Sequence, residues 1–395
     1  MKSHLEKYGA RLLAHGLAAS IGDAALYGRD DHIVSNRTEI DSRTRELFDR
    51  LDITFLLVLT PATPYREILV ELCTGGENPI KPQDGETALF LHDIPVVDPH
   101  DSEALRRALS GRNGCVLRDG RIVSRGTVSM EQAFVTAGSI CFATFVKYFL
   151  DFLNFVTRNG RYVPFPPARA RRARFLLSTV PPMPVAGLLA PMPTGSAREI
   201  AAAMDACGKK TVETRLVDSF FGNISWCDGK EIHISQTGAS LDELPGQIDR
   251  IPLDGSSTAG MSASSETGTH LAIYGATGSR AILHGHPRFS VVLSMYCTEA
   301  GCRHDDACSR TCPVPRSVGD IPIVPGEVGT GEYALARTVP PAIRGKRGVI
   351  VYGHGVFCAG ESFPETFDSL VSIERGCFAR YRELVGGRRA RPETR

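Results

Sequence analysis

Apolar and polar residues follow two periods along the chain, one typical of helices and one typical of short strands. In the second half, apolar positions at helical spacing predict helices at residues 198–210, 264–276 and 364–385. Short apolar runs bounded by glycine-rich turns predict strands at residues 231–238, 279–287 and 348–356. Helices interleaved with strands favour a layered α/β fold.

The connection between the two halves has a different composition. Residues 163–195 hold eight prolines, so we expect a connector without long regular structure, although residues 173–180 have strand character. The expected division is a first domain at 1–160, a Pro/Arg-rich linker at 161–195, a second domain at 196–385 and a flexible tail at 386–395.

The two halves resemble each other in a common order of weak matches. Residues 32–41 align without gaps on residues 233–242. The other matches place Gly22–Asp23 opposite Gly222–Asn223, Pro64 opposite Pro287, and Asp119 opposite His354. This order predicts a duplicated domain. The first copy lacks every histidine that the second copy offers to a metal, so we expect it to be metal-free.

The charge balance and the cysteine content limit the classes of partner and the cellular location that the sequence favours. The 395 residues include 45 basic and 44 acidic side chains, so no net field favours nucleic acid or an anionic membrane. The most apolar stretch, residues 133–156, contains Lys147 and Asp151, which favours a buried helix over a membrane span. Eleven cysteines without an export pattern predict a reducing, cytoplasmic location.

Three histidines in the second half are the main candidates for chemistry. His284 and His286 lie one residue apart at the end of a predicted strand, so both side chains point to the same face. His354 ends another apolar run and is flanked by two glycines, which allow a close turn around a site. Three histidines leave a coordination position open, as in catalytic zinc sites. The alternative is that each is an ordinary core or loop histidine.

The segment around Glu266 has two interpretations. Ser264 and Ser265 suit a helix N-cap with Glu266 in the first turn, which is simple capping. The functional interpretation is a helix N-terminus that receives an anion such as phosphate, with Glu266 as acid/base beside the metal. His270, one turn along the helix, is expected to be a packing residue. The loops at 221–226 and 235–240 are turns that could also offer N–H and hydroxyl groups to phosphate.

Together the motifs GNIS, SQTG, SSET, HGHP and GHG, spread from about residue 197 to 380, resemble the class II aldolase and adducin family. The resemblance implies tandem three-layer α/β/α domains with a largely antiparallel central sheet. It implies that His284, His286 and His354 bind Zn²⁺ or another divalent ion, and that Glu266 is the acid/base and a fourth ligand. It also implies a phosphate pocket formed by Asn223, Thr237, Gly238, Ser264 and Ser265.

The implied activity is that of a metal-dependent aldolase, a lyase that cleaves a carbon–carbon bond in a sugar phosphate or related hydroxy-carbonyl compound through an enediolate. An epimerase or a dehydratase would use the same site, and a non-catalytic, adducin-like scaffold is the other alternative. Because the family forms tetramers, we expect a homodimer of two-domain chains that imitates one. Tyr27, Tyr65 and Tyr381 are all open as the tyrosine that the family supplies from a neighbour.

An insertion after the predicted strand at 279–287 carries four cysteines within sixteen residues: Cys297, Cys302, Cys308 and Cys312. With His304 among them, they could hold a structural zinc ion or an iron–sulfur cluster. Two local disulfides or free thiols are equally compatible with the spacing. The insertion lies near the predicted mouth of the site, where it could act as a lid.

Overall fold

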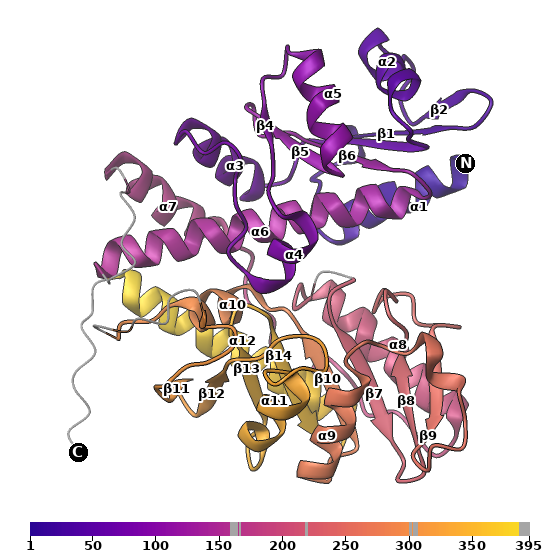
Figure 1. The fold of residues 1–395 in the computed structure, drawn as a ribbon, viewed down its shortest axis with the longest axis vertical. Coiled ribbons are helices and arrows are strands. Elements are labelled where there is room, and N and C mark those ends of the chain that lie inside the picture. The colour runs from indigo at the N-terminus through magenta and orange to yellow at the C-terminus, as the bar shows by residue number, and fades with distance from the viewer. Residues whose placement is uncertain (159–164, 166, 218–219, 300–301, 303–306, 387–395) are drawn as a thin grey trace. The chain divides into compact units, whose positions relative to one another are not determined.

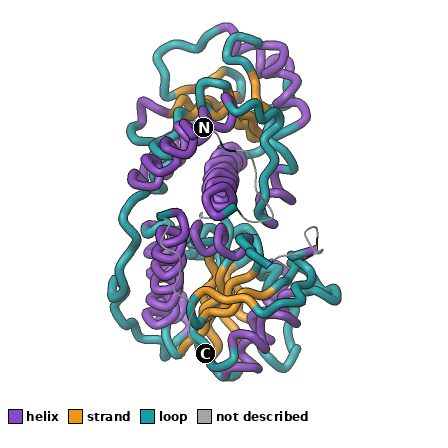
Figure 2. Tube along the Cα trace, turned by 90° about the vertical axis from the view of Figure 1, so that its left-hand side faces the viewer, coloured by secondary structure: helices purple, strands orange, loops and turns teal. Residues whose placement is uncertain are grey.

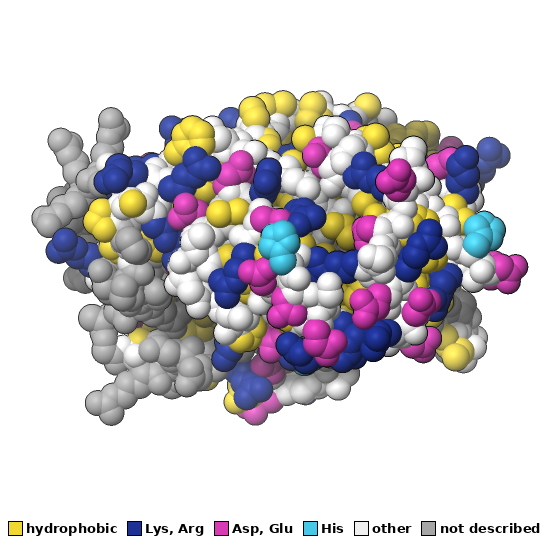
Figure 3. All heavy atoms as spheres, turned by 90° about the horizontal axis from the view of Figure 1, so that it is seen from above, with side chains coloured by type: hydrophobic (Ala, Val, Ile, Leu, Met, Phe, Trp, Pro, Cys, Tyr) yellow, Lys and Arg dark blue, Asp and Glu magenta, His cyan; other side chains and the backbone are white. Residues whose placement is uncertain are grey.

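The computed structural model describes residues 1–158, 165, 167–217, 220–299, 302 and 307–386 (Figure 1). The chain divides into two compact units. The N-terminal unit comprises Met1–Phe152 and Pro164–Pro181, and the C-terminal unit comprises Leu153–Val163 and Pro182–Arg395. Figure 3 shows acidic and basic side chains interspersed over the face that it displays, in keeping with a net charge of +1.

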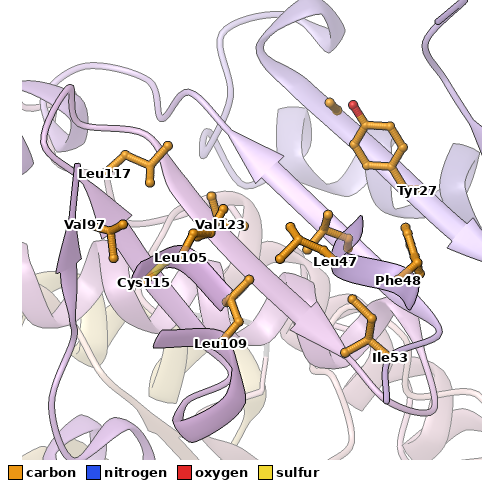
Figure 4. Close-up of a cluster of buried hydrophobic side chains, with 12 residues drawn as sticks. Tyr27, Leu47, Phe48, Ile53, Val97, Leu105, Leu109, Cys115, Leu117 and Val123 are labelled. Carbon is orange, nitrogen blue, oxygen red and sulfur yellow. The ribbon is translucent and has the colours of Figure 1, made fainter. Parts of the chain in front are cut away.

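The N-terminal unit is built on a six-stranded sheet in the order β2-β1-β3-β6-β5-β4. Its strands are β1 (Ala24–Arg29), β2 (Ile33–Ser35), β3 (Phe55–Leu59), β4 (Val96–Val97), β5 (Gly114–Leu117) and β6 (Ile122–Gly126). Its helices are α1 (Lys2–Ala14), α2 (Ser42–Arg50), α3 (Tyr65–Thr74), α4 (Gly85–Leu91), α5 (Ser102–Gly111), α6 (Met130–Thr157, which extends past the unit boundary) and α7 (Pro167–Thr179). Figure 4 shows Leu47 of α2 and Leu105 of α5 directed toward Val123 in one buried cluster.

Two expectations for this part of the chain have different outcomes. The apolar stretch at 133–156 forms α6, which is long and apolar enough to cross a membrane, yet 89% of its most apolar window is buried inside the structure. The buried-helix prediction is therefore confirmed. The expectation of irregular or strand structure at 163–195 is wrong over Pro167–Thr179, which forms α7. Pro167 is the first residue of that helix, where a proline costs no hydrogen bond, and residues 168–179 within the helix contain no further proline.

The C-terminal unit is built on an eight-stranded sheet in the order β11-β12-β13-β14-β10-β7-β8-β9. Its strands are β7 (Asn223–Cys227), β8 (Glu231–Ser235), β9 (Ile248–Pro252), β10 (Ala281–Gly285), β11 (Arg316–Val318), β12 (Ile321–Val324), β13 (Gly348–Val351) and β14 (Val356–Gly360). Its helices are α8 (Ala197–Glu213), α9 (Thr267–Thr277), α10 (Arg288–Met295), α11 (Leu335–Ile343) and α12 (Phe363–Val385). All neighbouring strands are antiparallel except β12 and β13.

Helices cover both faces of this sheet (Figure 2). On one face, α9 and α11 contribute Ile273 and Leu335 to a core cluster with Ile282 of β10. On the other face, a Cβ built on Gly285 would meet Leu370 of α12. Successive residues of a strand point to opposite faces, so His284 points to the α9 side together with Ile282. The predicted three-layer α/β/α fold with a largely antiparallel sheet is confirmed.

The two units share one topology, which confirms the duplication. The order β2-β1-β3-β6-β5-β4 matches β8-β7-β10-β14-β13-β12, and every neighbouring pair runs in the same sense, including the single parallel pair. The strand registers correct the expected alignment by one to three residues. Ala24–Ala25, not Gly22–Asp23, match Gly222–Asn223, and Pro61 rather than Pro64 matches Pro287. Gly120 rather than Asp119 matches His354.

The same registers show what stands at the metal-ligand positions of the first copy. Val58 occupies the position of His284, and Thr60, two residues later, that of His286. Gly120 occupies the position of His354. None of these three residues offers an imidazole, so the first copy lacks the histidine set, as predicted.

Candidate metal centre

Three histidines meet at the ends of two neighbouring strands of the C-terminal unit. His284 is the fourth residue of β10, His286 follows the end of that strand, and His354 lies in the turn between β13 and β14. All three are buried, and their ligand atoms lie within 4.8 Å of one another. The Nε2 atoms of His284 and His286 are 3.0 Å apart. The predicted convergence of these three imidazoles is therefore present in the fold.

The surroundings fix the ring of His284. Its Nδ1 lies 3.0 Å from the carbonyl oxygen of Val356, to which it donates a hydrogen bond. A proton on Nδ1 places the lone pair of the ring on Nε2, the atom that lies 3.0 Å from Nε2 of His286. Phe357 stacks on the same ring with centroids 4.0 Å apart. The ring therefore has one orientation and one tautomer suited to binding a cation.

The turn that carries His354 comes very close to β10. A Cβ built on Gly355 would lie 2.5 Å from the carbonyl oxygen of Gly285, 2.7 Å from Cδ2 of His286 and 2.9 Å from Cε1 of His284. Real Cβ contacts are almost never this short. Only glycine lets the turn approach so closely, which explains why the sequence places one directly after His354.

Glu266 reaches the histidines from the N-terminal end of α9. It occupies the N-cap position, yet its side chain makes no capping hydrogen bond. Instead, Oε1 lies 3.1 Å from Nε2 of His354, and Oε2 lies 3.6 Å from Nε2 of His284. Burial alone would raise the pKa of Glu266, but His284, His354 and the Asn223 amide outweigh it, so the net shift is downward. The simple capping interpretation is therefore wrong for this side chain.

Comparison with known proteins finds a family whose model matches part of the C-terminal unit. A family model described as the class II aldolase and adducin N-terminal domain matches residues 202–381. The match covers residues 202–381, and this part of the chain is called the class II aldolase domain below.

Several solved structures of aldolases or aldolase domains are similar to about half of the chain. The l-fuculose-1-phosphate aldolase of Thermus thermophilus is 24% identical, with 48% of this chain and 98% of that chain covered and a TM-score of 0.38. A sugar-phosphate aldolase of Thermotoga maritima is 20% identical, with coverages of 49% and 98% and a TM-score of 0.37. The N-terminal class II aldolase domain of a Thermoplasma acidophilum protein is 13% identical, with coverages of 49% and 98% and a TM-score of 0.34. No curated protein matches the chain.

The predicted phosphate-binding residues of the class II aldolase domain divide into two groups. Thr237 and Ser264 lie on two loops that an isolated bridge between Gln236 and Ala263 joins, and Oγ1 of Thr237 donates to the Ala263 carbonyl oxygen at 2.8 Å. Gly238, in the left-handed region with φ of 73°, and Ser265 follow them on the same two loops, and both are exposed. Asn223 belongs to a different group, because its Nδ2 donates to Oε2 of Glu266 at 2.7 Å.

A set of buried polar residues that the sequence pattern did not predict lies behind Glu266. His270 was expected to be a packing residue, but its Nε2 lies 2.5 Å from Oδ1 of Asn223 and its Nδ1 lies 2.6 Å from Oγ of Ser225. Oγ of Ser225 in turn lies 2.7 Å from the hydroxyl oxygen of Tyr274. The signal in the sequence was the spacing of 266, 270 and 274, which places three polar residues on one face of an otherwise apolar helix.

The insertion with four cysteines was the other predicted place for metal ligands. Among the described residues, no group of three or more potential ligands includes Cys297, Cys302, Cys308 or Cys312. His304 lies outside the described residues, so a cluster in the insertion stays a prediction. A second group does occur at Asp228, Glu231 and His233. There Arg250 already donates to Oε1 of Glu231 at 2.6 Å, which places a positive charge where a cation would bind.

The three candidate tyrosines are all buried. The exposed fraction is 5% for Tyr27, 2% for Tyr65 and 0% for Tyr381. A phenol that serves a neighbouring subunit has to project from the surface, so none of the three is suited to that role.

Proposed function

We propose that the class II aldolase domain is a divalent-metal-dependent lyase that cleaves a carbon–carbon bond in a sugar phosphate or a related hydroxy-carbonyl compound. The observation that carries this proposal is the meeting of three buried imidazoles with one buried carboxylate. Buried ionisable groups in this number are costly to a fold unless they are paired or bind an ion.

The donor set fits a divalent ion. Two imidazole nitrogens only 3.0 Å apart can share one proton, whereas a cation between them and His354 would satisfy the lone pairs of both. His284, His286 and His354 would hold the ion, with Glu266 close enough to be a fourth ligand. Three imidazoles and a carboxylate suit Zn²⁺, and they leave room for substrate once the carboxylate withdraws. When bound, such an ion supplies Lewis-acid stabilisation of negative charge on substrate oxygens.

Glu266 is the residue of this chain that would move a proton. Its carboxylate lies at the start of α9, between the histidines and the loops at 236–238 and 262–265. A carboxylate with a lowered pKa is ionised at neutral pH, so it is ready to accept a proton from a substrate hydroxyl and to return it. Epimerisation and dehydration would use the same groups, and they remain alternative outcomes of a substrate screen.

The proposed substrate class rests on the loops beside Glu266. Ser264 and Ser265 offer hydroxyl groups, and Gly238 leaves the backbone open, at the positive end of the α9 dipole, whereas the hydroxyl of Thr237 already donates to the Ala263 carbonyl oxygen. Such a place favours a phosphate, although a carboxylate would be received by the same groups.

Metal analysis with two matched variants tests the proposal. We expect one tightly bound divalent ion per chain, because the first copy has Val58, Thr60 and Gly120 at the ligand positions. His284→Ala should lose both the ion and turnover in a screen of ketose-1-phosphates. His233→Ala, which removes the histidine of the second group, should retain both. Loss of the ion in His233→Ala with retention in His284→Ala would place the ion elsewhere and refute the proposal.

A second pair of measurements separates an enzyme from a scaffold. Glu266→Gln should retain the ion and lose ~10²–10⁴-fold in turnover, the usual contribution of a positioned acid/base. Folded protein that holds no ion and acts on no hydroxy-carbonyl compound would favour an adducin-like binding role instead.

A further inference from the structure

A second feature of the class II aldolase domain is an interlocked row of polar side chains behind Glu266. Glu266, His270 and Tyr274 follow one another at intervals of four residues, so they line one face of α9. Asn223 and Ser225 are two residues apart on β7, so they point to the same face of the sheet. The side chains alternate between helix and strand in the order Glu266, Asn223, His270, Ser225, Tyr274, and each contacts the next.

The hydrogen bonds in this row can run in one direction only. A carboxylate accepts, so the Asn223 amide must turn Nδ2 toward Glu266 and Oδ1 toward His270. Nε2 of His270 must therefore carry a proton and donate. Burial lowers the pKa of His270 to about 3, so the ring is neutral and its Nδ1 accepts from Ser225. Ser225 then accepts from the hydroxyl of Tyr274, whose pKa burial raises well above its usual value.

We propose that His270, Ser225 and Tyr274 are positioning residues that lock the Asn223 amide in one orientation and, through it, aim the Glu266 carboxylate at the three histidines. The proposal rests on the proposed function for its catalytic consequence, but not for the direction of the hydrogen bonds. Without His270, the amide of Asn223 is free to flip. Its Oδ1 would then face the carboxylate of Glu266 and repel it.

The first copy of the domain supports this assignment. The strand registers place Ala25 at the position of Asn223 and Tyr27 at that of Ser225. Both strand members of the row are therefore absent from the copy that lacks the histidine set, although its six strands pair in the same order as their counterparts. The fold therefore forms without the row, and the row occurs in the copy that has the histidine set.

The first experiment needs no substrate. Long-range ¹H–¹⁵N spectra of histidine-labelled protein should show His270 at pH 7 as the neutral ring with its proton on Nε2. Ser225→Ala should shift the Nδ1 resonance, because that nitrogen loses its donor. A proton on Nδ1, or a charged ring, would mean that the chain of hydrogen bonds does not run toward Glu266, and the proposal would be overturned whether or not the protein is an enzyme.

The second experiment is a kinetic double-mutant cycle. His270→Phe should lower kcat ~10–100-fold, the usual range for residues that orient a metal site, with KM and ion content unchanged. His270→Gln, whose amide can still donate to Asn223, should recover part of the loss. Because His270 acts through Asn223, the double variant of His270→Phe with Asn223→Ala should be no slower than Asn223→Ala alone. Effects that multiply would show independent roles and refute the proposal.

A control variant and the ion measurement keep the outcomes separate. His233 is also buried and lies on the neighbouring strand β8, where it pairs with Trp226 and so points to the sheet face opposite to that of Asn223 and Ser225; His233→Phe should therefore leave kcat unchanged. An equal loss of kcat in His233→Phe would mean that the effect of His270→Phe is general and would count against the positioning role. If the wild-type protein holds no ion and turns over no substrate, the proposed function fails, and the tautomer of His270 still decides the direction of the row.

Discussion

Gly355→Ala is the smallest change that should damage the candidate metal centre without removing any of its ligands. The new methyl group would lie 2.5 Å from the carbonyl oxygen of Gly285, about 0.9 Å inside the 3.4 Å at which ordinary contact begins. It would also lie 2.7 Å from the ring of His286 and 2.9 Å from that of His284. Relief requires moving the backbone at the end of β10, the turn that carries His354, or the two rings.

Each way of relieving the clash has a measurable cost. Overpacking of a buried site costs ~1–3 kcal/mol of folding free energy, and the value should lie in that range because one obstacle is backbone. Displaced ligands should weaken ion binding as well, by ~10–100-fold if the shift resembles the loss of a residue that orients a metal ligand. The two effects are separable, because the first is present without any ion.

Fluorescence offers a direct assay. Trp226 is the single tryptophan of the chain and lies buried on β7, so its emission reports unfolding of the class II aldolase domain only. Urea titrations of ion-free Gly355→Ala should show an earlier midpoint, and zinc competition should show weaker binding. Gly376→Ala on α12 is the matched control, because nothing lies within 4 Å of its added Cβ and alanine favours a helix by ~0.5–1 kcal/mol. A Gly355→Ala protein with the wild-type midpoint and wild-type zinc affinity would refute the steric reasoning.

Three further predictions use the same fluorescence signal. Burial lowers the pKa of His270 from 6.5 to about 3, so between these values the unfolded chain binds a proton that the native state does not. The contribution of His270 to the free energy of unfolding should therefore be fully present above pH 6.5 and be lost as the pH drops toward 3, at ~1.4 kcal/mol per unit of pKa difference. His270→Gln should flatten this slope, and an unchanged slope would contradict the assignment. Removing the ion with a chelator should lower the unfolding midpoint, since an ion at 100 times its Kd stabilises by ~2.7 kcal/mol, whereas His284→Ala should not respond to the chelator. Ser294→Ala should cost ~1–3 kcal/mol, because the buried amide of Gly353 donates to Oγ of Ser294 at 2.8 Å and would lose its acceptor; an unaltered midpoint would argue against it.

The sequence was sufficient to predict the histidine set because each member has a local signal. The spacing of His284 and His286 on a strand fixes a common face, and the glycines around His354 indicate a close turn. The polar row behind Glu266 has a weaker signal, because only its three helix members share a regular spacing and the row itself exists only where α9 crosses β7. Asn223 and His270 are 47 residues apart, and a polar residue on an apolar helix face is as compatible with packing as with function.

The errors in the internal alignment have a physical origin as well. Strand residues are fixed by hydrogen-bond register, whereas turns and helix starts tolerate insertions. Pro64 therefore resembles the counterpart of Pro287 in sequence, although the registers of β3 and β10 place Pro61 at that position. The expectation of a linker without a helix is wrong over α7 for a related reason, since a proline at the start of a helix does not prevent the helix that follows.

The first copy serves as an internal control for what the fold needs and what the site needs. The position of Gly355 is held there by Arg121, the residue after Gly120 in the matching turn. In that copy Val58 and Thr60 stand at the positions of the two histidines, so the imidazole rings that a side chain at position 355 would meet are absent. The ligands and the small residue that lets them converge are therefore absent together, and the sheet order and strand pairing are unchanged. The sheet order therefore does not depend on a glycine at this position, and the glycine at 355 is explained by the close approach of its turn to the end of β10 and to the two histidine rings there.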